Sequence, residues 1–262
     1  MFTVTSKDGT EIAYDKVGRG PAVILVDGAL AVRASGTALA ELLAPNFTVY
    51  YYDRRGRGDS TDTNPYSLEK EVEDLEALIG IAGGPVYLYG SSSGGALGLE
   101  AAIRLGDKIK KLAVYEVPYD SSEAGVKAWR KYRAKLSELL AADRRGDAVA
   151  LFMKFVGVPD DALESMRQAA TWQSMEALAP TLAYDSVVVG EDRIVPTERA
   201  ASITSQTLVM DGSASYEPMP FMRATAKALA KAIPNAQHQV LEGQRHDVDP
   251  NVLAPILKEH WL

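Results

Sequence analysis

Short apolar runs alternate with amphipathic segments through the first half of the chain and return near its C-terminus. The runs Ala22–Asp27, Phe47–Tyr52 and Val86–Tyr89 are almost entirely apolar, which is typical of strands buried on both faces of a parallel sheet. Leu68–Ile81 instead has apolar residues at helical spacing. Strands that alternate with helices in this way predict an α/β fold, in which helices cover both faces of a mostly parallel central sheet.

Other segments extend this α/β pattern at both ends of the chain. Phe2–Ser6 and Thr10–Val17 alternate apolar and polar residues around Asp8-Gly9, which predicts an antiparallel hairpin. Further strands are predicted at Lys111–Val117, Gln206–Asp211 and Gln237–Leu241, and further helices at Ala38–Leu43, Met222–Ile233 and Val252–Leu262.

The alternation stops between residues 118 and 205, where no strong strand pattern occurs. Helices are predicted at Val126–Leu139, Val149–Val156 and Ala162–Leu178. Val187–Val189 is a weak strand candidate within this region. An all-helical insertion of this size after a sheet strand predicts a lid over the carboxyl edge of the sheet. We therefore divide the chain into an α/β core of residues 1–117 and 206–262 and a helical lid of residues 118–205.

Composition and charge exclude several classes of protein. The chain has 262 residues, a net charge of −7 and no cysteine, so nucleic acid is not an expected partner and disulfide or thiolate chemistry is not available. No apolar stretch is long enough to span a membrane, and the first residues lack the pattern of a signal peptide. We predict a cytoplasmic protein without a membrane partner, and we make no prediction of its oligomeric state.

The most informative motif is Gly-Ser-Ser-Ser-Gly at residues 90–94, between a predicted strand and a helical segment. A G-x-S-x-G sequence in that setting is typical of a nucleophile elbow, a tight turn that needs small residues two positions before and after the serine. Ser91 is a poor candidate because Tyr89 stands two residues before it, and Ser93 would place the turn one residue late. Ser92 fits best as the nucleophile; the alternative is a glycine–serine loop without chemistry.

A serine hydroxyl needs a base, and the chain has three histidines. His246 is preferred because it lies in a glycine-containing loop after the last predicted strand, where the loops of a parallel sheet converge on ligands. Its position also suits the chain order of nucleophile, acid and base. His238 opens the last predicted strand, and His260 is expected on the surface of the terminal helix.

These features together resemble the α/β-hydrolase superfamily over nearly the whole chain. The matching parts are residues 27–29 (Asp-Gly-Ala), 53–60 (Asp-Arg-Arg-Gly-Arg-Gly-Asp-Ser), 90–95 and 243–246, together with the helical insertion. The resemblance implies a cofactor-free serine hydrolase, with the backbone N–H groups of Ala29 and Ser93 as its oxyanion hole. It implies no particular substrate, because this fold supports many reactions.

The acid that orients the histidine departs from the commonest pattern of the superfamily. Most members place it a few residues past the strand that here ends at Met210, near Ser215, which is not an acid. Members that resemble haloalkane dehalogenases place it at the end of the strand after the elbow helix, where this chain has Glu116. A glutamate at the end of an apolar strand is costly without a partner, which also favours a specific role. We predict Glu116 as the acid, with Asp211 as the alternative.

A second departure is Asp27, where the superfamily usually has histidine before the glycine of the oxyanion loop. A carboxylate aimed into the oxyanion hole would oppose the developing negative charge. We therefore predict that Asp27 points away from the hole, and that it bonds loop amides or pairs with Arg54 or Arg55.

We expect a small carboxylic ester or lactone as the substrate, cleaved through an acyl-enzyme, because esters are the easiest acyl donors and a lid would restrict access. Apolar lid residues are candidates to line the acyl pocket, or equally to form the core of the lid: Trp129, Phe152, Met153, Phe155, Met166 and Trp172. Two other functions stay open, namely a lyase, perhydrolase or biosynthetic cyclase with the same polar site, and a non-catalytic ligand-binding protein. The chain shows no spacing of metal ligands and no phosphate-binding or dinucleotide fingerprint, so no metal or cofactor is predicted.

Overall fold

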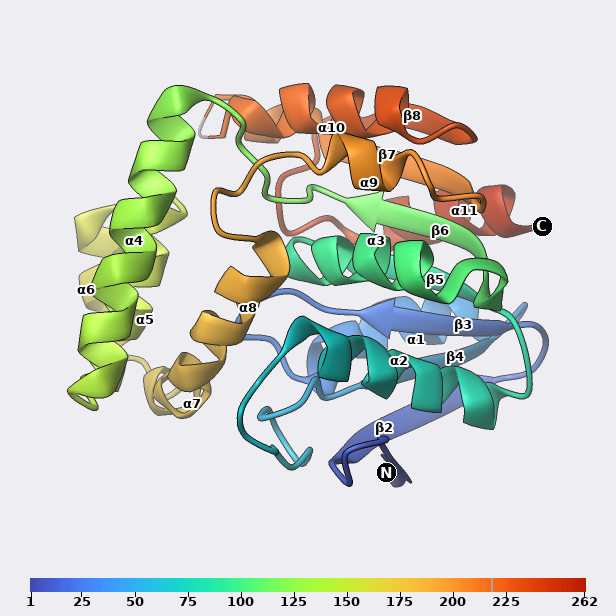
Figure 1. Cartoon of the computed structure of the whole chain (residues 1–262), viewed down its shortest axis with the longest axis horizontal. Helices are drawn as coiled ribbons and strands as arrows, with labels where there is room; N and C mark the ends of the chain where they lie inside the picture. Colours follow the sequence, from blue (N-terminus) through green and yellow to red (C-terminus); the bar gives the residue numbers. More distant parts are fainter. Residues whose placement is uncertain (218) are drawn as a thin grey trace.

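An eight-stranded sheet forms the centre of the molecule (Figure 1). The structure is a computed structural model, and it describes residues 1–217 and 219–262. The strands are β1 Phe2–Thr5, β2 Glu11–Gly18, β3 Ala22–Val26, β4 Thr48–Tyr52, β5 Val86–Ser91, β6 Ile109–Tyr115, β7 Gln206–Gly212 and β8 Ala236–Leu241. They lie in the order β1-β2-β4-β3-β5-β6-β7-β8. The β1–β2 and β2–β4 pairs are antiparallel and the other neighbours are parallel, which confirms the predicted hairpin and the mostly parallel sheet.

Helices cover both faces of the sheet, as the alternating pattern predicts. They are α1 Thr37–Leu43 and α11 Pro250–Trp261 on one face, and α2 Leu68–Ala82, α3 Ser93–Leu105 and α10 Phe221–Ala232 on the other. Each face buries its own apolar cluster. On the α1 and α11 face, the ring of Trp261 stacks on Tyr87 with the ring centroids 5.7 Å apart. Aromatic stacking of this kind fixes the terminal helix against the middle of the sheet.

In the described chain, the segment between β6 and β7 is helical. Its helices are α4 Glu123–Ala141, α5 Arg145–Phe155, α6 Asp160–Gln168, α7 Trp172–Leu178, α8 Leu182–Val189 and α9 Thr197–Ala200. Figure 1 shows α4 to α7 beyond the carboxyl ends of the parallel strands. Helix α8 packs against both α3 and α4, so it joins the insertion to the core. None of the described helices has the length and apolar character that a membrane crossing needs.

Two predicted elements of the insertion are wrong. Ala162–Leu178 forms two helices rather than one, because the backbone of Ala169 is extended at φ −74° and ψ 146°. The chain turns there, and both Leu163 and Trp172 are buried. Val187–Val189 is the last turn of α8 and not a strand. A short apolar run cannot distinguish a buried strand from one turn of a buried helix by periodicity.

Candidate active site

Ser92 occupies a tight turn between β5 and α3. Its backbone angles, φ 54° and ψ −128°, lie outside the regions that a serine normally adopts. A Cβ on Gly90 would lie 2.4 Å from the carbonyl oxygen of Gly94, and a Cβ on Gly94 would lie 2.2 Å from that of Val26. These contacts explain why the turn needs glycine on either side of Ser92, and they give the serine the setting of a nucleophile elbow.

A carboxylate from the neighbouring strand contacts His246. Nδ1 of His246 lies 2.7 Å from Oε2 of Glu116. The other carboxylate oxygen, Oε1, accepts the N–H of Gly212 at 3.0 Å. Glu116 directly follows β6, is 2 % exposed and has a left-handed backbone with φ 44°. A carboxylate beside Nδ1 favours the tautomer that carries its proton there, which leaves Nε2 of His246 as an acceptor.

Asp211, the alternative acid, has other partners. Its carboxylate contacts Nε2 of His238 and accepts the hydroxyl of Tyr216 at 2.6 Å. The structure therefore brings Glu116, and not Asp211, to His246.

His260, which is expected on the surface, is partly exposed. Its Nε2 lies 3.1 Å from the carbonyl oxygen of Leu112, and its side chain is partly buried between α11 and the sheet. Burial lowers the pKa of this histidine.

Ser92 and His246 line one cavity of about 520 Å³ between the core and the helical insertion. No hydrogen bond joins the Ser92 hydroxyl to the His246 ring within the described residues. Such bonds are often long before a substrate binds and shorten in the complex. The structure thus places both side chains at the same cavity without a hydrogen bond between them in the described residues.

Ala29 and Ser93 line the same cavity. In residues 1–217 and 219–262 their N–H groups have no backbone acceptor. Ser93 is the first residue of α3, where N–H groups are unpaired and the helix dipole is positive. The two amides could therefore stabilise negative charge on an oxygen that lies between them.

A buried polar network that the sequence patterns do not predict lies behind Gly28. Asp185 of α8 accepts Nη1 of Arg54 at 2.8 Å and Nη2 of Arg57 at 2.8 Å. It also accepts the Ser93 hydroxyl at 2.7 Å. Arg57 in turn donates to the Gly28 carbonyl oxygen at 2.5 Å, so the network fixes the loop that carries Ala29.

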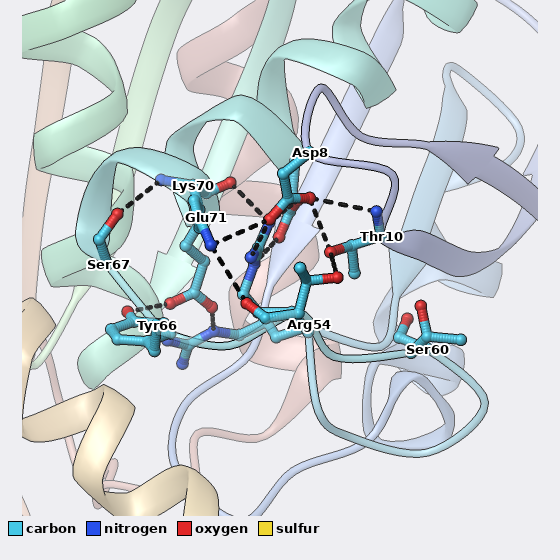
Figure 2. A network of polar contacts seen from close by, with 12 residues as sticks. Asp8, Thr10, Arg54, Ser60, Tyr66, Ser67, Lys70 and Glu71 are labelled. Carbon is cyan, nitrogen blue, oxygen red and sulfur yellow. Dashed lines mark hydrogen bonds and ion pairs between the residues drawn. The ribbon is translucent and has the colours of Figure 1, made fainter.

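The network continues from Arg54 into the core. Figure 2 shows the Glu71 carboxylate between Arg54, whose Nε lies 2.6 Å away, and the Tyr66 hydroxyl, 2.5 Å away. Burial alone would raise the pKa of the Asp185 carboxyl, but Arg57 and Arg54 hold it below the ordinary value. The carboxylates of this network are therefore ionised at neutral pH.

The cavity wall contains three of the predicted pocket residues, Trp129, Phe152 and Phe155. Met153, Met166 and Trp172 are not among its described lining residues. Met166 packs against an apolar cluster shared by the core and the insertion, and the buried Trp172 donates its indole N–H to Glu176 at 2.8 Å. Lining residues that were not predicted include Tyr132, Leu182, Val189, Arg193, Phe221 and Met222. The described chain contains no cluster of three or more side chains that could hold a metal ion.

The family model described as alpha/beta hydrolase family matches residues 29–254. The chain belongs to the alpha/beta-hydrolase family. A solved alpha/beta hydrolase from Sphaerobacter thermophilus is 50% identical, with a TM-score of 0.90 over 100% of both chains. This chain is accordingly a hydrolase of that family.

Two curated relatives of this alpha/beta hydrolase match parts of the chain. The uncharacterized hydrolase YraK of Bacillus subtilis is 34% identical over 112 residues, which span 41% of this chain and 41% of the relative. The pimeloyl-[acyl-carrier protein] methyl ester esterase of Xanthomonas axonopodis is 29% identical over 209 residues, which span 70% of this chain and 81% of the relative.

Within the described residues, Asp27 of this alpha/beta hydrolase forms neither of the predicted contacts, a hydrogen bond to loop amides or an ion pair with Arg54 or Arg55. Arg54 contacts only the backbone oxygen of Asp27, at 3.4 Å, and Arg55 pairs with Asp74 at 2.7 Å. The Asp27 carboxylate lines the cavity and has no hydrogen bond or ion pair with the described residues. Burial raises its pKa to about 6, although Arg57 and Arg54 act in the opposite direction. Asp27 has no arginine partner because Arg54 forms ion pairs with Glu71 and Asp185, and Arg55 forms one with Asp74.

Proposed function

We propose that this chain is a serine hydrolase that cleaves a carboxylic ester or lactone through an acyl-enzyme intermediate. The observation that carries the proposal is the 2.7 Å contact between Glu116 and His246, at the cavity that Ser92 also lines. The similarity to a pimeloyl-[acyl-carrier protein] methyl ester esterase supports ester cleavage.

In the proposed first step, Ser92 Oγ attacks the acyl carbon while Nε2 of His246 takes the hydroxyl proton. Glu116 stabilises the imidazolium that forms. The carbonyl electron pair moves onto oxygen, where the N–H groups of Ala29 and Ser93 bind the negative charge. When the carbonyl reforms, the bond to the alcohol oxygen breaks and the leaving group takes the proton from His246.

Water completes the proposed cycle. His246 takes a proton from water, and the hydroxide that forms attacks the carbonyl carbon of the acyl-enzyme. The bond to Ser92 then breaks, the serine oxygen regains its proton from His246, and the acid is released. The sequence of steps balances without a cofactor.

In this proposal the helical insertion, residues 118–205, acts as a lid over the site. Trp129, Phe152 and Phe155 form an apolar wall that suits the hydrocarbon part of a small acyl group. A covered, largely apolar cavity would also strengthen the hydrogen bonds that hold the oxyanion.

A fluorophosphonate probe and p-nitrophenyl butyrate test the proposal together. We expect the probe to label Ser92 of the folded protein, and we expect Ser92→Ala to lose both labelling and hydrolysis. Ser91→Ala is the matched control and should still be labelled. A folded protein without labelling at Ser92 contradicts the proposal. Labelling without turnover of any ester or lactone in a panel would instead favour a non-hydrolytic reaction at the same site.

A further inference from the structure

Arg193 is a buried arginine that the proposed reaction does not use. It lies between α8 and α9, is 6 % exposed and has a left-handed backbone with φ 58°. Its side chain lines the cavity that Ser92 and His246 also line. A buried guanidinium is costly unless a partner compensates its charge, so the contacts of Arg193 matter.

The protein surrounds Arg193 with aromatic rings and does not pair it with an acid. Its Nε donates to the backbone oxygen of Pro118. The guanidinium carbon lies 4.4 Å from the ring centroid of Phe221, 5.1 Å from that of Phe155 and 5.6 Å from that of Trp129. In the described part of the chain, no carboxylate forms an ion pair with it.

The other buried arginines differ from Arg193 in this respect. Arg54 pairs with Glu71 at 2.6 Å, and Arg55 and Arg57 pair with aspartates at 2.7 Å and 2.8 Å. Burial lowers the pKa of Arg193 to about 10, and the more distant Asp120 offsets this only in part. Among the buried arginines described, the one without a carboxylate is therefore the one that lines the cavity.

We propose that Arg193 binds a carboxylate on the substrate, so that the enzyme prefers esters or lactones that carry a second, free acid group. This inference rests on the proposed function. A guanidinium offers parallel N–H donors that match both oxygens of a carboxylate, and rings that exclude water strengthen such a pair. The acidic residues of the described wall, Asp27, Asp185 and Asp247, repel an anion when they are ionised.

The arrangement also predicts what lies between the two groups of the substrate. The scissile carbonyl would lie at Ser92, and the carboxylate would lie at Arg193, whose aromatic neighbours belong to α4, α5 and α10. Phe152, Leu182 and Met222 supply apolar surface on the same wall. A hydrocarbon chain with an ester at one end and an acid at the other, as in a half-ester of a dicarboxylic acid, fits this pattern.

Matched pairs of methyl esters test this inference. One member of each pair is the monomethyl ester of a dicarboxylic acid from succinate to suberate, and the other carries a primary amide in place of the free acid. For the best chain length, we expect wild-type kcat/KM to be at least about tenfold higher for the acid than for the amide. Arg193→Gln should reduce this ratio to about one, and Arg193→Lys should retain part of it.

Arg130→Gln is the matched control, because it removes an exposed arginine of the same insertion that pairs with Asp192 at 2.7 Å. We expect this variant to keep the full preference for the acid. A wild-type ratio of one or below overturns the inference, even if Arg193→Gln does not fold. A preference that survives in folded Arg193→Gln also overturns it, because a purely structural arginine would not change the ratio.

Calorimetry with adipate separates this inference from the proposed function. We expect Ser92→Ala protein to bind adipate, to bind the neutral diamide adipamide at least about tenfold more weakly, and to lose the difference when Arg193→Gln is added. If wild-type protein hydrolyses p-nitrophenyl butyrate but shows no preference for acids, the inference fails and the proposed function stands. If labelling and hydrolysis fail but Arg193-dependent binding of adipate is found, the proposed function fails and the carboxylate site at Arg193 stands.

Discussion

Two buried carboxylates stand at the ends of neighbouring strands, and each contacts a different histidine. Glu116 follows β6 and contacts His246, which lines the cavity. Asp211 lies at the end of β7 and contacts His238, which is not among the lining residues described. Only the first pair is therefore placed to act on a ligand that also reaches Ser92.

Glu116→Gln and Asp211→Asn should differ in their effect on turnover. The amide of Glu116→Gln cannot stabilise an imidazolium, so we expect kcat for p-nitrophenyl butyrate to fall by roughly a hundredfold to ten-thousandfold. Asp211→Asn should change kcat by less than about threefold, because its partners His238 and Tyr216 lie outside the proposed site. A large loss from Asp211→Asn with little loss from Glu116→Gln would show that the acid is wrongly assigned.

Asp27 should make the protein less stable as pH rises. Its pKa is about 6 in the folded protein against an ordinary value of 3.8, so the folded state binds the proton more tightly than the unfolded state does. Stability is therefore lost as pH increases from about 4 to 6, and above that range the cost is at most about 3 kcal/mol. Asp27→Asn should remove this cost, since the amide carries no charge.

Urea denaturation at pH 8 and pH 5 checks this prediction. We expect Asp27→Asn to raise the free energy of unfolding at pH 8, and to raise it by about half as much at pH 5, where wild-type Asp27 is largely protonated only in the folded state. Asp247→Asn, which removes an exposed carboxylate at the same cavity, should stay within about 0.5 kcal/mol at both values. If Asp27→Asn raised the free energy of unfolding more at pH 5 than at pH 8, the result would contradict the raised pKa of Asp27.

At the scale of elements, the Asp185 carboxylate is one of the contacts that join α8 to the core. Asp185 is the acid that faces both Arg54 and Arg57 across this contact, and the three side chains are buried. The same carboxylate holds the Ser93 hydroxyl at the start of α3. The position of α8 is thus coupled to the loop that carries Gly28 and Ala29, because Arg57 also donates to the Gly28 carbonyl oxygen.

Asp185→Asn should destabilise the protein by about 3–5 kcal/mol, because it leaves two buried guanidinium groups without their shared negative charge. The amide is nearly isosteric, so the loss would report charge rather than volume. Urea denaturation measures it, with Ser186→Ala as the control. The Ser186 hydroxyl bonds only its own helix, at the Leu182 carbonyl oxygen, and its loss should cost about 1 kcal/mol or less. Equal effects of the two substitutions would refute the proposed coupling.

Local sequence patterns predict the strands and helices better than they predict which distant residues these elements contact. β3, β4 and β5 are nearly continuous apolar runs because both of their faces are covered, and the sequence predicts them for that reason. The break at Ala169 has no proline or glycine to mark it, and it serves tertiary burial of Trp172, so periodicity alone misses it. Asp185 carries a weak local signal, a single acid in the otherwise mainly apolar helix α8, but its arginines lie far away in the chain.

At the scale of the whole molecule, the parallel sheet brings distant segments to one edge. Residues after β3, β5, β6 and β8 meet at the cavity, as expected where the carboxyl ends of parallel strands converge. Ser92, Glu116 and His246 could be named in advance because motif and chain order identify loops at that edge. Arg193 could not be named in advance, because what distinguishes it is the lack of a carboxylate partner among the described residues. No pattern in the sequence indicates that lack.

The size of the cavity should limit the acyl group, because core and insertion residues line a space of only about 520 Å³ at Ser92. Phe155 lines this space, whereas Met166 belongs to the insertion but is not among the described lining residues. Phe155→Ala should therefore shift the acyl chain length with the highest kcat/KM upward by about two to four methylene groups, the volume that a phenyl ring leaves in a close-packed wall. Met166→Ala, the matched control, should leave the optimum unchanged. The check is kcat/KM for a series of p-nitrophenyl esters from acetate to decanoate. An optimum that moves equally in both variants would contradict the prediction, because it would show an effect of destabilising the insertion rather than of enlarging the cavity.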